Sequence, residues 1–88
     1  MKERIGKYLD AEQWPALPGR VTSRWGIYSV SGKGLLGMVA WYGPWRQYTF
    51  DPEADTTYNV ACLRDIAQFL AAQNAAHRQK VEAVERAI

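Results

Sequence analysis

The longest apolar run in the chain covers residues 35–42. In an extended strand successive side chains point to opposite faces, and here both faces would be apolar. One face would carry Leu36, Met38, Ala40 and Tyr42, and the other Leu35, Gly37, Val39 and Trp41. A strand that is apolar on both faces is typical of the centre of a sheet. Residues 35–42 are therefore predicted to form the central strand, in which Gly37 leaves room for a neighbouring ring or backbone.

Two more strands are predicted beside it. Residues 21–30 are rich in β-branched and aromatic side chains and lead into Ser31-Gly32-Lys33-Gly34, a turn sequence whose glycines can adopt positive φ. Gly43-Pro44 makes the next turn, and residues 46–50 then alternate between polar and apolar side chains, with Tyr48 and Phe50 expected in the core. The pattern predicts a three-stranded antiparallel β-meander over residues 21–52.

Helical periodicity is clear only in the last third of the chain. Thr57 or Asn59 can cap a helix there, and an apolar stripe follows at three- and four-residue spacing: Cys62, Leu63, Ile66, Phe69 and Leu70. No proline or glycine interrupts residues 57–88, so one helix of about 40 Å is expected, roughly twice the length of a strand. Its distal part, with Val81, Val84 and Ile88 on one stripe, either bends back over the core near His77 or projects and pairs with a second copy as a homodimer.

The N-terminal 20 residues are expected to add little regular structure. Residues 2–13 have too few apolar positions for more than a short, marginal helix. The segment from Trp14 to Gly19 holds two prolines within four residues, so an extended linker is predicted, with Trp14 folded back over one edge of the core. The predicted fold is a single α+β domain over residues 1–88, in which a three-stranded antiparallel β-meander packs against one C-terminal helix.

Composition agrees with a small globular domain, because hydrophobic residues make up 48% of the chain. No stretch approaches the roughly 20 apolar residues that span a bilayer, and the first residues lack the apolar run of a secretory signal. We therefore expect a cytoplasmic protein that does not enter membranes. Cys62 is the one cysteine and His77 the one histidine, so neither a disulfide nor a zinc site is expected within the chain, and no cofactor.

Catalytic constellations are also missing from the sequence. His77 lies in a polar helical segment, and Cys62 lies on the predicted core stripe, where cysteine behaves as a small apolar residue. Three acidic residues at 51, 53 and 55 lack the glycine and terminal glutamate of a calcium loop. The sequence Gly32-Lys33-Gly34 lacks the spacing of a phosphate-binding loop. We therefore expect a protein that is not an enzyme.

The most unusual segment is residues 41–50, which read W-Y-G-P-W-R-Q-Y-T-F and place five aromatic residues and one arginine around a Gly-Pro turn. The surrounding segment from Gln13 to Phe50 contains no acidic residue but four basic ones: Arg20, Arg24, Lys33 and Arg46. Basic and aromatic side chains together can attract a polyanion and stack on bases. The alternative is a solvated rim around a β core in which Arg46 only braces its own loop.

The binding site predicted from this segment has Trp45 and Arg46 at its centre, because a tight turn lifts side chains clear of the sheet. The other predicted binding residues are Trp41, Tyr42, Arg24 and Lys33.

Two patterns in the chain are specific enough to compare with known families. They are Leu36-Gly37-x-Val39-x-Trp41-Tyr42-x-Pro44-Trp45-Arg46-x-Tyr48-x-Phe50-x-Pro52 and Cys62-Leu63-x-Asp65-Ile66-x-x-Phe69. On these residues the chain resembles a family of small proteins that phages, prophages and other mobile elements carry. The resemblance covers roughly residues 34–70 and implies a setting, an accessory protein of a mobile element acting in the host cell, without a mechanism.

Three functions stay open on this basis. The Trp- and Arg-rich sheet face or turn can bind nucleic acid, with Arg46 and Arg24 on phosphates and Trp45 or Trp41 on bases. The same residue types dominate protein interfaces, so an inhibitor of a host defence complex, similar to an anti-CRISPR protein, is the alternative. The third function is a structural or oligomerisation module that acts through the C-terminal helix alone.

Overall fold

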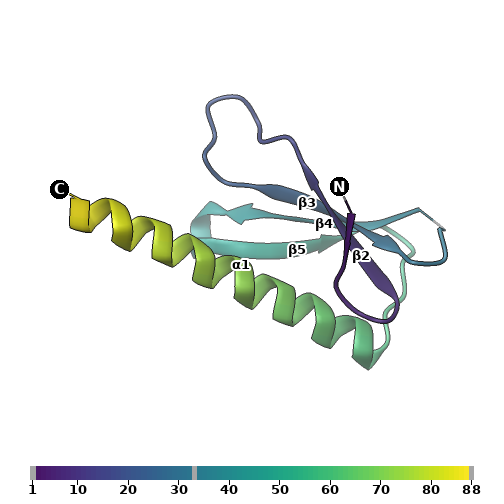
Figure 1. Cartoon of the computed structure of the whole chain (residues 1–88). Helices are drawn as coiled ribbons and strands as arrows, with labels where there is room; N and C mark the ends of the chain where they lie inside the picture. The colour runs from purple at the N-terminus through teal and green to yellow at the C-terminus, as the bar shows by residue number, and fades with distance from the viewer. Residues whose placement is uncertain (1, 33, 88) are drawn as a thin grey trace.

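The computed structural model describes residues 2–32 and 34–87, the last four of them by their backbone. In chain order the elements are β1 (Lys2–Arg4), β2 (Leu9–Trp14), β3 (Arg24–Ser29), β4 (Leu35–Tyr42), the 3₁₀ turn η1 (Gly43–Trp45), β5 (Gln47–Pro52) and α1 (Val60–Ala87). The five strands form one antiparallel sheet in sequence order, and α1 crosses one face of it and continues past its end (Figure 1). The α+β class is as predicted.

The predicted three-stranded sheet and the short N-terminal helix are wrong, because residues 2–14 add two strands. In β2 the side chains of Leu9 and Ala11 are buried at 1% and 0% exposure, whereas Asp10 and Glu12, which alternate with them, point away from the core. This alternation has the period of a strand. With only two small or medium apolar residues, this alternation is too weak to identify a strand from the sequence. The strand forms because β2 pairs with β3, where Ala11 lies opposite Ile27.

Trp14 is also placed differently from the prediction. It is the last residue of β2, opposite Arg24 in the register, and lies on the sheet face that α1 does not cover. Its ring rests on Gly26, where an added Cβ would come within 2.3 Å of the indole. Trp14 therefore covers the outer face of β3 and is not a plug over the core edge. The extended linker begins after it, at residue 15.

The hairpins predicted around residues 35–42 are present. β4 pairs with β3 on one side and β5 on the other, so it is an interior strand, although β3 is the middle strand of the five. Gly32 and Gly34 in the β3–β4 turn have φ values of 79° and 95°. Gly37 admits the Phe50 ring, as its position in the strand predicted.

The core lies between α1 and the inner face of the sheet. Its buried side chains are Leu9, Ala11, Trp25, Ile27, Val39 and Tyr48 from the strands and Cys62, Ile66 and Phe69 from α1. Trp25 contacts Tyr48 and Phe69 edge to face, at centroid distances of 5.5 and 5.3 Å. Phe50 is partly buried and packs edge to face on Tyr58.

The helix begins at Val60, and its first turn is capped as the sequence indicated. The Cys62 backbone N–H donates to Asn59 Oδ1 at 2.8 Å. Leu63 departs from the predicted core stripe, because Cys62, Ile66 and Phe69 turn toward the sheet and leave Leu63 53% exposed on the solvent side. The helix is unbroken to Ala87, so it does not bend at His77. The side chains of Val84 and Ile88 lie outside the described residues, and tail pairing stays a prediction.

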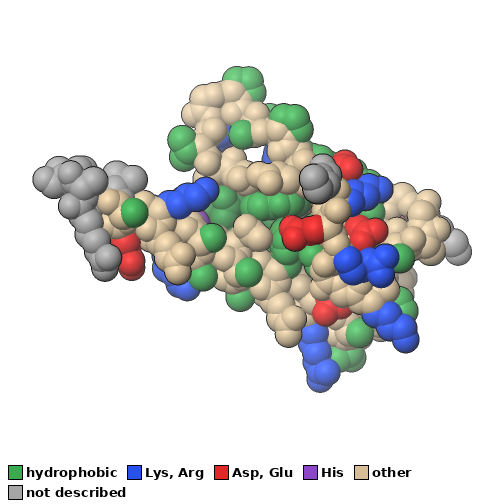
Figure 2. All heavy atoms as spheres, in the orientation of Figure 1, with side chains coloured by type: hydrophobic (Ala, Val, Ile, Leu, Met, Phe, Trp, Pro, Cys, Tyr) green, Lys and Arg blue, Asp and Glu red, His purple; other side chains and the backbone are tan. Residues whose placement is uncertain are grey.

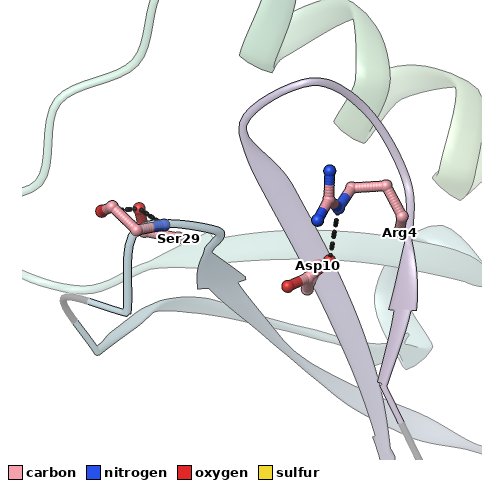
Figure 3. A network of polar contacts seen from close by, with 4 residues as sticks. Arg4, Asp10 and Ser29 are labelled. Atoms are coloured by element: carbon pink, nitrogen blue, oxygen red, sulfur yellow. Dashed lines mark hydrogen bonds and ion pairs between the residues drawn. The ribbon is translucent and has the colours of Figure 1, made fainter.

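Both edges of the sheet are protected against pairing with other strands. At the β1 edge the strand is three residues long and wholly exposed, and Arg4 Nε donates to Asp10 Oδ1 of β2 at 2.9 Å. Figure 3 shows this pair together with the hydroxyl contact of Ser29 in the β3–β4 turn. At the β5 edge the Tyr48 backbone N–H donates to Asn74 Oδ1 of α1 at 2.7 Å. A partner is therefore expected to be recognised through side chains and not through added strands.

Replacing Asn74 with alanine is expected to lower the free energy of unfolding by about 1–2 kcal/mol, because the partly buried Tyr48 N–H loses its acceptor. Alanine has a higher helix propensity than asparagine, which offsets part of this loss of stability. Urea denaturation of Asn74→Ala measures it. Asn74→Asp keeps an acceptor oxygen at the same place and should lose less. Equal losses in the two variants would contradict a role for this hydrogen bond.

Candidate functional site

A groove of about 390 Å³ lies where the end of β4, the η1 turn and the middle of α1 meet. We call it the turn groove. Its lining consists of Trp41, Trp45, Arg46, Gln47, Ala71, Asn74, His77 and Arg78. Three of the six predicted binding residues, Trp41, Trp45 and Arg46, therefore lie around one concave surface.

The backbone of the turn explains why two of these side chains stand clear of the sheet. Pro44 lies at the start of η1, and the turn closes with Arg46, whose N–H donates to the Gly43 carbonyl at 3.1 Å. Arg46 has the left-handed conformation, with φ of 53°. Trp45 is 66% exposed as a result. Within the described part of the chain the Arg46 guanidinium has no hydrogen-bond or ion-pair partner, so it does not brace its own loop there.

The floor of the turn groove is a stack of rings. Trp41 contacts Tyr48 edge to face at 5.2 Å on one side and His77 at 4.3 Å, with a 39° tilt, on the other. Trp41 and His77 are both half-buried, so each keeps one part of its ring accessible. Arg78 follows His77 on α1 and lines the groove opposite the turn.

His77, Arg78 and Asn74 are site residues that the sequence analysis missed. The sequence places His77 in a polar helical segment, and the structure adds that its ring packs on Trp41. A signal was present in the spacing. Asn74 and His77 follow Leu70 at four and seven residues, so they continue the stripe that faces the sheet with polar side chains in place of apolar ones.

The charge around the turn groove is mainly positive. Arg46 and Arg78 line it, and both are exposed. A smaller hollow of about 280 Å³ adjoins it and reaches Glu82, the only carboxylate among the described residues that line either space. This arrangement favours an anionic ligand that can also contact aromatic rings.

The remaining predicted binding residues lie outside the turn groove. Tyr42 contacts Trp45 edge to face at 5.0 Å, but from the outer face of the sheet. Arg24 lies over the Trp14 ring, and its Nε donates to the Pro15 carbonyl at 2.9 Å. That bond holds Arg24 against the β2–β3 loop. Lys33 lies outside the described residues.

The groups considered for chemistry are dispersed in the structure. Cys62 is a free thiol buried in the core, away from His77 in the turn groove. Over the described residues, no three His, Cys, Asp or Glu side chains come together in a way that could hold a metal ion. None of the helices in the described ranges is long and apolar enough to cross a membrane.

Comparison with known proteins gives one informative match. Neither a protein-family model nor a solved structure matches the chain. Over 53 residues the chain is 30% identical to an uncharacterised 9.3 kDa protein of Acholeplasma phage L2, and the matched region covers 60% of this chain and 68% of that protein. The chain therefore belongs to a family of small phage proteins that includes the 9.3 kDa protein of phage L2.

Proposed function

We propose that this phage protein is a non-enzymatic binding protein that holds a single-stranded segment of nucleic acid in the turn groove, inside the host cell. The observation that carries the proposal is the exposed Trp45 ring beside Arg46 and Arg78, both exposed and neither held in an ion pair among the described residues. Arg46 and Arg78 line opposite walls of the groove, and Trp41 and His77 supply ring surface between them. Exposed rings with flanking cations are the elements from which single-strand binding sites are built.

A single strand suits this geometry better than a duplex. Bases can stack on Trp45 or Trp41 only where they are unpaired and accessible. The outer face of the sheet, which would have to lie in the groove of a duplex, carries Asp10, Glu12 and Asp51 among its cations. These carboxylates would repel the phosphates of a duplex. The helix covers the inner face, so neither sheet face favours a duplex.

Removing Arg46 is expected to weaken binding of an oligothymidylate by about tenfold, because one charge-assisted phosphate contact is lost. The test variant is Arg46→Gly, since glycine accepts the left-handed conformation of this position and relieves about 1 kcal/mol of strain. Fluorescence anisotropy of a labelled oligonucleotide measures the affinity. The melting temperature should stay constant or rise slightly.

Two comparisons make this test specific: substitution of one arginine in the groove and of one far from it, and binding at two salt concentrations. Arg78→Ala should weaken binding as Arg46→Gly does, whereas Arg64→Ala, an exposed arginine about 21 Å away along the same helix, should not. With two phosphate contacts, raising salt from about 50 to about 200 mM should weaken binding about sevenfold. Absence of binding at the lower salt, or an equal loss in Arg64→Ala, would contradict the proposal.

A host protein is the second candidate partner, with inhibition of a defence complex as the resulting function. Trp45 is exposed at the tip of a turn with Arg46 next to it and Tyr42 against its ring, and these three residue types dominate protein interfaces. The protein would then bind no oligonucleotide at either salt concentration. Trp45→Ala would instead reduce recovery of one specific host complex.

A further inference from the structure

A second concave surface lies on the other side of His77 from the turn groove. It is a hollow of about 520 Å³ between the β2–β3 loop and α1, and we call it the loop hollow. Trp25 and Tyr48 line it from the sheet, Val21 from the loop and Val81 from the helix. Figure 2 shows hydrophobic side chains in this space, between the loop and the helix. Pockets of roughly 300–1,000 Å³ are large enough to hold small molecules.

The loop hollow and the turn groove belong to one continuous cleft. The smaller hollow of about 280 Å³ shares Trp41 and His77 with the turn groove, and it shares His77 and Val81 with the loop hollow. His77 therefore lines all three spaces. A strand held in the turn groove can pass around the contact between Trp41 and His77 and reach the loop hollow.

The charge along this cleft suits a polyanion. Arg46 and Arg78 line its first part, and the exposed Lys80 lines the loop hollow. Glu82 is the only carboxylate among the described residues that line any of the three spaces. Within the described ranges none of these four side chains forms an ion pair. Positive charge therefore exceeds negative charge along the cleft, which favours the phosphates of a strand.

One amide distinguishes the loop hollow from a purely apolar docking surface. Gln73 lines the hollow and is half-buried, and its side chain makes no hydrogen bond within the described part of the chain. The amide offers a donor and an acceptor side by side. An apolar side chain in the hollow would leave both unpaired and take them from water, which is unfavourable. The hollow therefore suits an occupant with apolar faces and a polar edge.

A nucleobase has these properties. We propose that one unpaired adenine of the strand inserts between Val21 and Val81 with its edge on Gln73, an inference that rests on the binding of a strand in the turn groove. Proteins that recognise single strands splay bases out in this way, pack them on side chains and form hydrogen bonds with their edges. Adenine is the base expected, because a glutamine amide can make two hydrogen bonds with it.

The test compares two short strands of equal length. One is an oligothymidylate, and the other is the same strand with a central thymine replaced by adenine. Fluorescence anisotropy at the lower salt concentration measures both affinities. The wild-type protein is expected to bind the adenine strand at least about fivefold more tightly. Both strands carry the same charge, so this difference reports recognition of the base and not attraction of the phosphates.

Three variants assign the preference to the loop hollow. Gln73→Ala should remove it, so that both strands bind with similar affinity. Ala76→Leu, at an exposed position that lines the hollow, narrows the space and should remove the preference as well. Gln68→Ala, at an exposed position of α1 outside the three spaces, is the matched control and should keep it. Each change introduces a strong helix former at a position that is not buried, so melting temperatures should stay close to wild type.

Three results would overturn the adenine site while strand binding in the turn groove remains. The first is equal affinity of the wild-type protein for the two strands. The second is a preference that persists in Gln73→Ala, which would assign it to stacking on Trp45. The third is displacement of the strand by an equal concentration of free deoxyadenosine monophosphate, which would assign the hollow to free nucleotides.

The proposed function fails on a different result, because it requires only that a strand binds. Absence of binding for both strands contradicts it and the adenine site together. Arg46→Gly should weaken both strands by the same factor and keep the ratio of their affinities. The contribution of the turn groove and that of the loop hollow are therefore measured separately.

Discussion

Replacing Trp25 with alanine is expected to lower the free energy of unfolding by about 3–5 kcal/mol, enough to leave much of the protein unfolded at 37 °C. Trp25 is 6% exposed and makes edge-to-face contacts with Tyr48 of β5 and Phe69 of α1. It therefore joins the sheet to the helix. Removing the indole loses its burial and leaves a cavity that the two remaining rings cannot close without moving both elements.

Thermal and urea denaturation measure this loss of stability, and substitution of a second, exposed tryptophan is the control. Trp45→Ala deletes the same side chain at a position that is 66% exposed, where the change should stay within about 0.5 kcal/mol. For a domain of this size, 3–5 kcal/mol corresponds to a fall in melting temperature on the order of 15–30 °C. Similar melting temperatures for the two variants would show that Trp25 is not the contact between the layers.

Replacing Gly37 with alanine is expected to destabilise the protein by about 2–3 kcal/mol, although alanine is a small residue. A Cβ at this position would lie 2.6 Å from the Phe50 ring and 2.7 Å from the Asp51 carbonyl oxygen. The ring could shift, but the carbonyl belongs to the backbone of β5, which is paired with β4 on both sides of this point. Relief therefore requires the strands to separate locally.

Gly43→Ala is the matched control, because a Cβ there would meet nothing within 4 Å. Its free energy of unfolding should change by no more than about 0.5 kcal/mol. The comparison is made by urea denaturation of both variants. If Gly37→Ala were as stable as Gly43→Ala, the close approach of Phe50 and β5 to Gly37 would be incorrect.

The buried Trp25 and the proposed site are joined by one series of aromatic contacts, which begins with Tyr48. Trp41, Tyr48 and His77 connect the rings of the core to the rings of the turn groove. The groove is therefore built on the packed rings of the core, and Trp45 and the two arginines lie exposed around it. This is why substitutions at the rim are expected to change binding without unfolding the protein.

The sequence by itself determined the elements that carry a strong local signal. The apolar residues of β4 required partners on both sides, and Gly43-Pro44 required a tight turn that exposes Trp45 and Arg46. The spacing of Cys62, Ile66 and Phe69 defined the buried face of α1, and of the two cap candidates, Thr57 and Asn59, the structure uses Asn59. In each case the signal lies in residues that are only a few positions apart, either a periodic pattern or a turn sequence. The element can therefore be recognised without knowing the rest of the fold.

Only the tertiary structure decided the features that depend on distant partners. β1 and β2 contribute few apolar residues, and their strand conformation is stabilised by the pairing of β2 with β3 and of β1 with β2 rather than by local preference. In the sequence, His77 is a polar residue in a polar helix segment. Its contact with a ring exists only because the fold places Trp41 of β4 against it. Leu63 matches the helical stripe in spacing, yet the direction in which α1 crosses the sheet leaves it exposed. These placements follow from packing between segments far apart in the chain, which local periodicity does not encode.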